Sequence, residues 1–285
     1  MVRPKLRRSF DRAATNYDAV AAFPQEIAKR MVERLSLVQL PARMILDAGC
    51  GTGGAASLLQ QRFAGAGIVQ LDASERMLAR RTTRRWPGWL RMGGRDARHA
   101  VCADFQMLPL ATGRFDLVWS NLALHWAEDL PAALAEASRV LRPGGLLMFS
   151  VFGPDTLREL RFASPDGLFR VNQHVDMHDI GDMLVQCGYT DPVMDMERVT
   201  LTYVDLVALL RDLRAHGSTA FAADGPPGLR ARTCLLRTVS QYEQLRDQDG
   251  RLPATFEVIY GHAWKPESRL SPKGRAVIDI RPARA

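Results

Sequence analysis

The residues best placed to bind a ligand form one glycine-rich run, DAGCGTGG, from Asp47 to Gly54. Glycine lets the backbone turn sharply and approach a bound molecule without a Cβ clash. A helix that starts after such a turn directs free N–H groups towards the ligand. Gly49, Gly51 and Gly54 satisfy the G-x-G-x-x-G pattern of dinucleotide sites, whereas Asp47 with Gly49, Gly51 and Gly53 satisfies a second pattern, D-x-G-x-G-x-G. The glycines alone leave both cofactor classes open.

Two further carboxylates stand where apolar runs end. Asp72 closes GIVQLD, where it could accept hydrogen bonds from both hydroxyls of a ribose. Asp104 closes AVCAD, a position suited to the exocyclic amine of adenine. One such aspartate alone is more often a turn or helix cap. The ordered series Asp47, Asp72 and Asp104, followed by FDLV and later by LRPGG, resembles class I S-adenosylmethionine-dependent methyltransferases more than dehydrogenases.

This resemblance implies S-adenosyl-L-methionine as the cofactor and a site built at the ends of successive strands. The expected cofactor-binding residues are Asp47, Gly49, Cys50, Gly51, Gly53, Asp72, Ala73, Met77, Asp104, Phe105, Asn121 and Leu122.

The elements that must position these residues alternate between short apolar runs and helical patterns, which is typical of βα units and a parallel sheet. Strands are predicted at 44–49, 67–72, 100–104, 115–121, 146–152, 192–201 and 254–264. Helices are predicted at 5–17, 24–37, 55–63, 75–85, 130–141, 175–189, 204–213 and 229–246. Ser74 is a candidate N-cap, RPGG is a stop signal after the helix at 130–141, and residues 86–99 are predicted to form a surface loop.

The predicted fold is therefore α/β, and the resemblance specifies it as the Rossmann-like class I methyltransferase fold. It implies a mostly parallel seven-stranded sheet with helices on both faces, N-terminal helices and a helical insertion before the last strand. We expect an N-terminal helical segment or lid at 1–38 and a cofactor-binding core at 39–200. Residues 201–264 would supply the insertion and final strand of the same domain, and 265–285 a loosely ordered tail.

Composition excludes several other classes of protein. The chain has 285 residues, of which 47% are hydrophobic and 24% are charged, as in an ordinary globular protein. No apolar run is long enough to cross a bilayer, and the N-terminus has no apolar signal region. The four cysteines stand far apart without metal-like spacing, which predicts free thiols in a reducing cytoplasm.

The charge balance is basic, with 38 Lys+Arg against 31 Asp+Glu and a net charge of +7. Such an excess suits an acidic partner or a phosphate, but it also suits a solvated surface. No basic stretch is interleaved with aromatic residues, so we expect no nucleic-acid partner.

Several longer segments resemble the malonyl-[acyl-carrier protein] O-methyltransferases of biotin synthesis, the BioC family. These are RRSFDRAATNYDAVAAFPQEIAKRMVERL, SNLALHWAEDLPAALAEASRVLRPGGLLMFS, FGPDTLRELR, VDMHDIGDMLVQCGY and LPATFEVIYGHAW, which together span most of residues 7–264. The 86–99 loop and the tail beyond Lys265 depart from the family. FGPDTLRELR and LPATFEV also resemble a methyltransferase-like complex I assembly factor whose relatives hydroxylate arginine. A non-catalytic, cofactor-binding interaction protein is a third hypothesis.

The BioC resemblance implies methyl transfer to the free carboxylate of malonyl-acyl carrier protein. That carboxylate is already ionised near pH 7, so no strong general base is needed, and catalysis would rest on positioning. The predicted catalytic residues are Tyr17, His125 and Trp126. Tyr17 would close over the methyl donor, and His125 would donate a hydrogen bond to the malonyl carboxylate or the thioester carbonyl. A structural role is the alternative for each.

Other charged residues are weaker candidates. Arg158 and Arg161 would orient a carboxylate if their segment forms a lid. His174 and His178 have the spacing of a metal pair, but no third ligand accompanies them, so no metal is expected. A basic rim would steer the acidic carrier protein; it comprises Arg3, Lys5, Arg7, Arg8 and Arg12, with Arg80, Arg81, Arg84 and Arg85 as possible additions.

Overall fold

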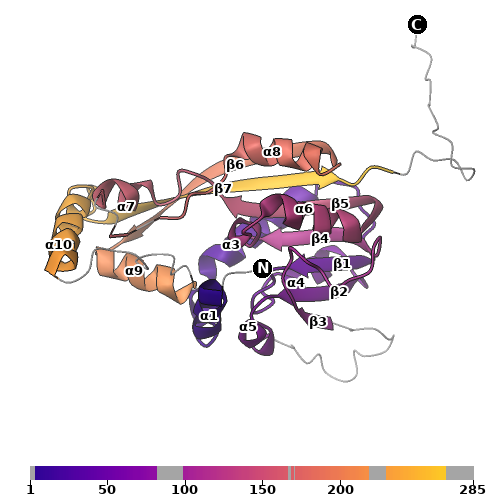
Figure 1. The fold of residues 1–285 in the computed structure, drawn as a ribbon, viewed down its shortest axis with the longest axis horizontal. Helices are drawn as coiled ribbons and strands as arrows, with labels where there is room; N and C mark the ends of the chain where they lie inside the picture. Colours follow the sequence, from indigo (N-terminus) through magenta and orange to yellow (C-terminus); the bar gives the residue numbers. More distant parts are fainter. Residues whose placement is uncertain (1–3, 82–98, 166–167, 170, 218–228, 268–285) are drawn as a thin grey trace, which may run out of the picture.

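The centre of the molecule is a seven-stranded sheet, seen in a computed structural model that describes residues 4–81, 99–165, 168–169, 171–217 and 229–267 (Figure 1). The strand order is β3-β2-β1-β4-β5-β7-β6. In chain order the strands are β1 (Met44–Ala48), β2 (Gly67–Asp72), β3 (His99–Cys102), β4 (Phe115–Asn121), β5 (Leu141–Phe152), β6 (Thr190–Tyr203) and β7 (Leu252–Trp264). Strand β7 pairs antiparallel with β5 and with β6, and the other four neighbouring pairs are parallel. The predicted mostly parallel α/β fold is confirmed.

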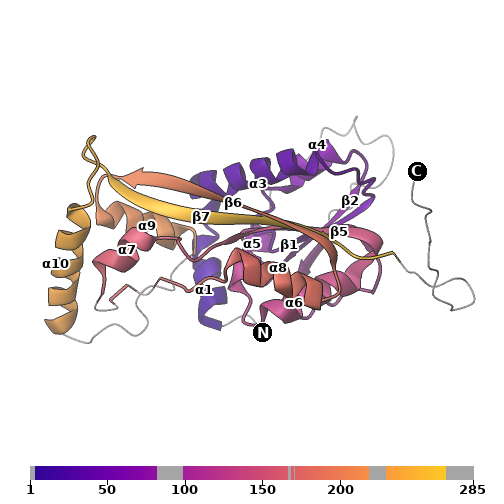
Figure 2. The ribbon, with the colours of Figure 1, turned by 90° about the horizontal axis from the view of Figure 1, so that it is seen from above.

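Helices cover both faces of this sheet. They are α1 (Pro4–Ala13), α2 (Tyr17–Val20), α3 (Ala22–Leu35), α4 (Ala56–Arg62), α5 (Glu75–Ala79), the 3₁₀ helix η2 (Leu124–Trp126), α6 (Leu130–Val140), α7 (Arg158–Ala163), α8 (Met177–Gln186), α9 (Leu206–Ala215) and α10 (Leu229–Glu243). Figure 2 shows α3 and α4 on one face, with α6 and α8 on the other. Each face has its own apolar core, and the central strands contribute to both. Parallel strands covered on both faces need continuous apolar runs, which is why FDLVWSN and LLMFSV were recognisable as strands.

Several elements have boundaries that differ from the predicted ones. Helix α5 ends at Ala79 instead of Arg85, and residues 82–98, which hold most of the predicted loop, lie outside the described part. Strand β5 begins at Leu141 and so includes RPGG. A register shift lets β4 pair with Leu141 and then with Leu146, and Gly144 takes a φ of +74° between them. The short helices α2 and α7 were not predicted.

Strands β6 and β7 form a long antiparallel pair that extends beyond the rest of the sheet. Strand β7 pairs with β5 only from Val258 to Trp264, whereas it pairs with β6 from Leu252 onwards. Its free half carries α7, α9 and α10, which pack around a separate apolar cluster (Figure 2). This cluster is the predicted helical insertion, now placed beside the end of the sheet.

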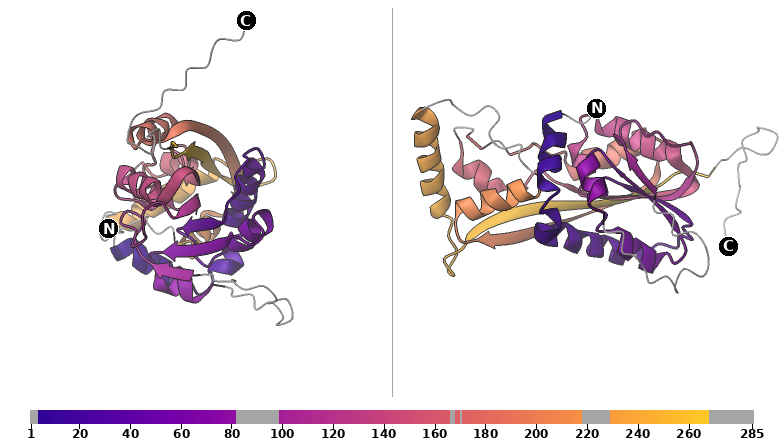
Figure 3. Two further views of the ribbon diagram at one scale, coloured as in Figure 1. Left: turned by 90° about the vertical axis from the view of Figure 1, so that its right-hand side faces the viewer. Right: turned by 90° about the horizontal axis from the view of Figure 1, so that it is seen from below.

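Helix α1 lies between the sheet and this insertion. Figure 3 shows α1 standing between the strands of the core and the group formed by α7, α9 and α10. Helix α1 packs on α5 through Ala13, Ala14 and Met77, with Phe10 and Tyr17 against the same cluster. Helix α1 is therefore placed where the strand ends and the insertion approach each other.

Candidate active site

The glycine loop joins β1 to α4 and requires glycine at alternate positions. Gly49, Gly51 and Gly53 have φ values of +79°, +55° and +81°, in the region that L-residues with a Cβ rarely adopt. A Cβ on Gly49 would also lie 2.2 Å from the Cβ of Ala123. Gly54 has neither constraint. The backbone therefore follows the D-x-G-x-G-x-G pattern, and the G-x-G-x-x-G match through Gly54 has no conformational basis.

This loop forms one wall of a pocket that encloses about 490 Å³, which we call the cofactor pocket. It is lined by Tyr17, Ala21, Pro24, Gln25, Ala28, Asp47, Gly49, Cys50, Gly51, Thr52, Gly54, Ala55 and Asn121. Five of the predicted cofactor residues thus meet here: Asp47, Gly49, Cys50, Gly51 and Asn121. The opposite wall comes from the N-terminal helices α2 and α3.

Asp47 gives this pocket an unsatisfied acceptor. Its carboxylate is 1% exposed, and Oδ2 has no hydrogen-bond partner among the described residues. Burial raises the pKa of Asp47 to about 7, although a hydrogen bond from Gln70 opposes the shift. A buried carboxylate without a partner is costly, so this atom fits a ligand that brings a donor or a positive charge. Together with the glycine cradle, it fits S-adenosyl-L-methionine.

Asp72, at the end of β2, lies under the same loop. Its Oδ2 accepts a hydrogen bond from the Gly51 N–H at 2.9 Å, and its Oδ1 accepts one from the Ser74 N–H at 2.8 Å. A carboxylate has about four acceptor positions, which leaves two for a ribose. Burial raises the pKa of Asp72, while these backbone hydrogen bonds lower it.

The other predicted cofactor residues lie outside this pocket. Asp104 accepts hydrogen bonds from the backbone and side chain of Gln106, at 2.9 and 3.0 Å. Phe105 and Met77 are buried in apolar clusters. Ala73 and Gly53 flank Asp72 and the glycine loop without lining the cavity, and Leu122 lines a second pocket instead. Their roles toward the cofactor stay predictions.

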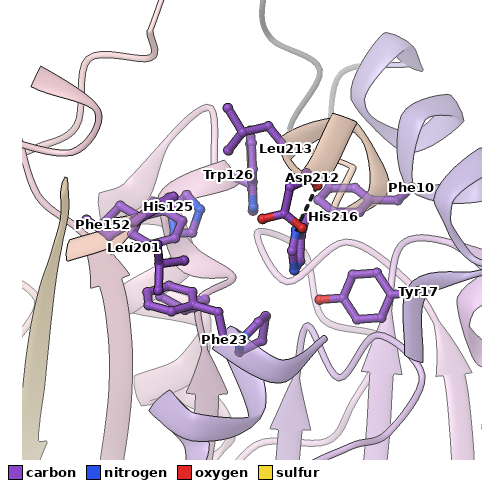
Figure 4. Close-up of a pocket in the computed structure, with 13 residues that line it drawn as sticks. Phe10, Tyr17, Phe23, His125, Trp126, Phe152, Leu201, Asp212, Leu213 and His216 are labelled. Atoms are coloured by element: carbon purple, nitrogen blue, oxygen red, sulfur yellow. Dashed lines mark hydrogen bonds and ion pairs between the residues drawn. The ribbon is translucent and has the colours of Figure 1, made fainter. Parts of the chain in front are cut away.

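The second pocket encloses about 530 Å³ and is predominantly aromatic (Figure 4). Its walls come from the N-terminal helices, η2, strands β5, β6 and β7, the residue after β4, and the C-terminal end of α9. We call it the aromatic pocket; it is lined by Phe10, Tyr17, Phe23, Pro24, Leu122, His125, Trp126, Phe152, Leu201, Asp212, Leu213, His216 and Phe256. Tyr17 and Pro24 line both pockets, so the two cavities meet at the N-terminal segment. The three predicted catalytic residues all line the aromatic pocket.

Tyr17 is held between the two pockets by its own neighbours in sequence. Asp18 Oδ1 accepts a hydrogen bond from Thr52 Oγ1 at 2.5 Å, and Asp11 Oδ1 accepts one from Ser74 Oγ at 2.6 Å. These bonds fasten the N-terminal segment over the glycine loop. Burial, reinforced by the charges of Asp72 and Asp18, raises the pKa of Tyr17 above its usual value. Its hydroxyl therefore keeps its proton at neutral pH and can donate a hydrogen bond.

His125 presents two free ring nitrogens to the aromatic pocket. Both nitrogens are buried and have no hydrogen-bond partner in the described ranges. Its ring centroid lies 4.8 Å from that of Phe152 and 5.4 Å from that of His174. Burial, with a smaller effect of His174, lowers the pKa of His125 well below its usual value. The imidazole is therefore neutral and offers one donor and one acceptor. Trp126 packs edge-on against Phe10, with the ring centroids 5.6 Å apart.

The weaker candidates are placed differently from one another. His174 is turned inward against His125 and Phe152, where burial lowers its pKa to about 4. His178 is exposed and bonded to Asp176. The metal-like spacing therefore brings no pair together, and no group of three possible ligands occurs among the described residues. Arg158 is exposed beside Glu159, and Arg161 donates to the backbone of Thr156.

The predicted basic rim is present only in part. Lys5, Arg7, Arg8 and Arg12 on α1 are exposed, as is Arg80 after α5. Arg81 was wrongly included, because its guanidinium turns inward and donates to Gln70 at 3.2 Å. Arg3, Arg84 and Arg85 lie outside the described residues.

Two polar residues of the aromatic pocket were not predicted, Asp212 on α9 and His216 directly after it, nor were its aromatic wall residues Phe10 and Phe23. They come from segments about 190 residues apart, and no local motif marks them. In the sequence each of them is a single polar or aromatic residue in or beside a predicted helix, and such a residue alone does not identify a site.

Comparisons with known proteins are consistent across the chain. A family model described as "Methyltransferase domain" matches residues 46–149. A malonyl-[acyl-carrier protein] O-methyltransferase from Methylovorus sp. (strain MP688) is 48% identical over 98% of this chain and 95% of its own length. One from Laribacter hongkongensis is also 48% identical, over 98% of this chain and 96% of its own.

A solved structure shows the same fold at low sequence identity. The YcgJ protein from Bacillus subtilis superposes with a TM-score of 0.58 at 15% identity, covering 85% of this chain and 99% of its own. None of the helices in the described ranges combines the length and the apolar character needed to cross a bilayer.

Proposed function

From the match to malonyl-[acyl-carrier protein] O-methyltransferases over nearly the whole chain, we infer that this chain, a member of that family, methylates malonyl-acyl carrier protein. The methyl group would pass from S-adenosyl-L-methionine to the free malonyl carboxylate, at the start of pimeloyl assembly for biotin. The single observation that supports this most strongly is the meeting of two pockets at Tyr17. One pocket has a glycine cradle and an unpaired carboxylate, and the other is lined mainly by aromatic side chains. Because relatives of the same name match nearly the whole chain, arginine hydroxylation is not retained.

We propose that the cofactor pocket holds the methyl donor through the glycine loop, Asp47 and Asp72. Asp47 would pair with a positive group of the ligand, and Asp72 would accept from the ribose through its two remaining acceptor positions. When bound, S-adenosyl-L-methionine supplies an electrophilic methyl group on a positively charged sulfur. The N-terminal segment, fastened through Asp11 and Asp18, would exclude water from this pocket.

The aromatic pocket would receive the acyl group. The ionised carboxylate and the sulfonium neutralise each other as the methyl group moves, so a dry pocket favours the transition state over the separated charges. Phe10, Phe23, Phe152 and Phe256 supply this apolar lining. No general base is needed, since the malonyl carboxylate is ionised near pH 7.

Tyr17 and His125 are the groups proposed to orient the acceptor. Tyr17, protonated at neutral pH, would donate to the carboxylate at the junction of the pockets. Neutral His125 would donate its single N–H to the carboxylate or to the thioester carbonyl, which would satisfy one of its unpartnered nitrogens. Trp126 would bound the pocket beside them. Rate enhancement would then come chiefly from placing the oxygen about 3 Å from the methyl carbon.

The exposed cations of α1 are the proposed docking surface for the carrier protein, which is acidic as a class. Lys5, Arg8 and Arg12 recur at helical spacing, while Phe10 of the same helix lines the aromatic pocket. The steering surface and the acceptor site would therefore share one helix. We also propose a cytoplasmic location, because Cys102 is an exposed free thiol that suits a reducing compartment.

The decisive experiment incubates the full chain with S-adenosyl-L-methionine labelled in its methyl group and either malonyl- or acetyl-carrier protein. We expect label on the malonyl form only, and its release by mild alkali, as a methyl ester requires. Label on acetyl-carrier protein, or label that resists alkali, contradicts carboxyl methylation. Cofactor binding without transfer to either carrier would support a non-catalytic protein instead.

A further inference from the structure

His216, in the wall of the aromatic pocket, makes two hydrogen bonds that the proposed chemistry does not use. Its Nδ1 lies 2.8 Å from the backbone oxygen of Asp212, and its Nε2 lies 2.7 Å from the backbone oxygen of Val20. The first partner belongs to α9 of the insertion, and the second ends α2 of the N-terminal segment. His216 is thus a direct connection between two parts of the chain that are about 200 residues apart.

Both partners are carbonyl oxygens, which can only accept hydrogen bonds. A neutral imidazole carries one N–H, so one of its nitrogens would direct a lone pair at a carbonyl oxygen. Both short contacts are attractive only if both nitrogens carry hydrogen, as in the imidazolium ion. A counter-charge is present, because Asp212 Oδ1 lies 3.6 Å from Nδ1. Asp212 is in turn fixed by the Tyr203 hydroxyl, which donates to its Oδ2 at 2.7 Å.

The surrounding contacts show what this connection holds in place. The His216 ring meets the Tyr17 ring edge-on, with the centroids 6.3 Å apart (Figure 4). At Gly217 a Cβ would lie 2.5 Å from the ring of Phe10, so the end of α9 packs closely on α1. Phe10 and Tyr17 both line the aromatic pocket, and Tyr17 also lines the cofactor pocket. The contact of His216 with the N-terminal segment therefore affects residues that line both the aromatic pocket and the cofactor pocket.

We propose that His216 is a positioning residue for methyl transfer, which as an imidazolium ion ties α9 to the backbone of Val20 and so holds Tyr17 between the two pockets. The role in methyl transfer rests on the proposed function, whereas the protonation state and the tie do not. The titratable groups in contact with His216 are Asp212 on α9 and Tyr17 on α2. Tyr203 on β6 acts through its hydrogen bond to Asp212, and Asp18, the neighbour of Tyr17, is bonded to Thr52.

The protonation state can be observed directly. In the full chain labelled with ¹⁵N-histidine, NMR at pH 7 should show hydrogen on both ring nitrogens of His216. The backbone amide signals of Val20 and Ala21 should shift together with the loss of that proton as the pH rises. His178 is the internal control, since its side chain is 84% exposed and its Nδ1 faces only the carboxylate of Asp176. A singly protonated His216 ring at pH 7, or Val20 and Ala21 signals that ignore its titration, overturns the proposal.

The functional part is tested with His216→Gln against the matched surface variant His178→Gln. A glutamine amide carries both of its N–H groups on one nitrogen, whereas the two carbonyls are reached from two different atoms of the His216 ring, so glutamine should bond to only one of them. We expect about a tenfold rise in KM for the malonyl-carrier substrate, because a hydrogen bond from a charged donor is lost. The decline of activity with rising pH should also be weaker in this variant than in the parent and in His178→Gln. If His216→Gln keeps the parent KM and pH profile, His216 does not position the site. If the parent itself transfers no methyl group, the proposed function fails, while the NMR result still decides the tie.

Discussion

Replacing single glycines of the cofactor loop by alanine tests the conformation assigned to that loop, because Gly49 and Gly54 should differ in how much stability the substitution costs. At Gly49 the φ of +79° costs an L-residue about 1–2 kcal/mol. The new Cβ would lie 2.2 Å from that of Ala123, and relieving such overpacking typically costs about 1–3 kcal/mol. The total of about 2–5 kcal/mol corresponds to a fall in melting temperature of about 4–20 °C, if about 2–4 °C is lost per kcal/mol.

Gly54→Ala is the matched control in the same loop. A Cβ at Gly54 meets nothing within 4 Å, and its φ lies outside the left-handed region. The same substitution should leave stability within about 1 kcal/mol of the parent, or raise it slightly by restricting the unfolded chain.

Thermal unfolding and calorimetric titration with S-adenosylhomocysteine measure both effects. Gly49→Ala should lower the melting temperature, or lose cofactor affinity at least tenfold if the loop moves to relieve the contact. Gly54→Ala should leave the melting temperature close to that of the parent; because Gly54 lines the cofactor pocket, it is the control for stability alone. If Gly54→Ala lowers the melting temperature as much as Gly49→Ala does, the loop follows the dinucleotide pattern and the assignment of its conformation is wrong. If Gly49→Ala is neutral, the close approach to Ala123 is wrong.

Three further outcomes are expected. Tyr17→Phe should lower kcat/KM about 10–100-fold, because a hydrogen bond to a charged group is lost. The control is Tyr189→Phe: the hydroxyl of Tyr189 donates to the backbone of Leu134, away from both pockets, so its loss should leave kcat/KM unchanged. Equal effects of the two substitutions would argue against a role of Tyr17 in methyl transfer. Burial raises the pKa of Asp47 to about 7, so between its unfolded value of 3.8 and pH 7 the folded state holds the proton and the stability of the parent falls as pH rises. The melting temperature of Asp47→Asn should therefore rise relative to that of the parent across this pH range, while the variant binds cofactor less tightly. A difference in melting temperature that does not change with pH would refute the shift. Initial rates with subsaturating malonyl-carrier protein should fall steeply between about 0.01 M and about 0.15 M salt, and Lys5→Ala with Arg8→Ala should flatten this dependence; a flat response in the parent would exclude steering by α1.

The sheet was predictable because its central strands are covered on both faces. MILDA and FDLVWSN had to be continuous apolar runs, and their bounds were close to those observed. The glycine loop was recognisable because a backbone that turns sharply around a ligand needs glycine at particular positions, which leaves a pattern in the sequence. The glycines alone left its two patterns open, and the ordered series Asp47, Asp72 and Asp104 favoured D-x-G-x-G-x-G. The positive φ of Gly53, which Gly54 lacks, agrees with that choice.

The acceptor side was much less predictable. Tyr17, His125 and Trp126 were predicted from the family resemblance together with their places in the N-terminal helix and after the strand at 115–121. Asp212 and His216, which line the same pocket, were not predicted. The aromatic pocket is assembled from segments separated by most of the chain, so its composition depends on tertiary packing rather than on local spacing. Arg81 shows the same limit of local sequence. Its position after the exposed Arg80 suggested a surface residue, but its side chain turns inward and donates to Gln70.

The contact between Val20 and His216 also constrains how the protein matures on the ribosome. The N-terminal segment emerges first, yet the residue that anchors its end is made 196 positions later. At about 5–20 residues per second, the first helices wait roughly 10–40 s for that partner. During this interval the parallel strands can assemble, and the apolar side of α3 has Ile45 and Leu59 to pack against well before α9 exists. The aromatic pocket is complete only when Phe256 on β7 has also been made, so both sites close late in synthesis. A nascent chain should therefore form its glycine loop before it can enclose a substrate.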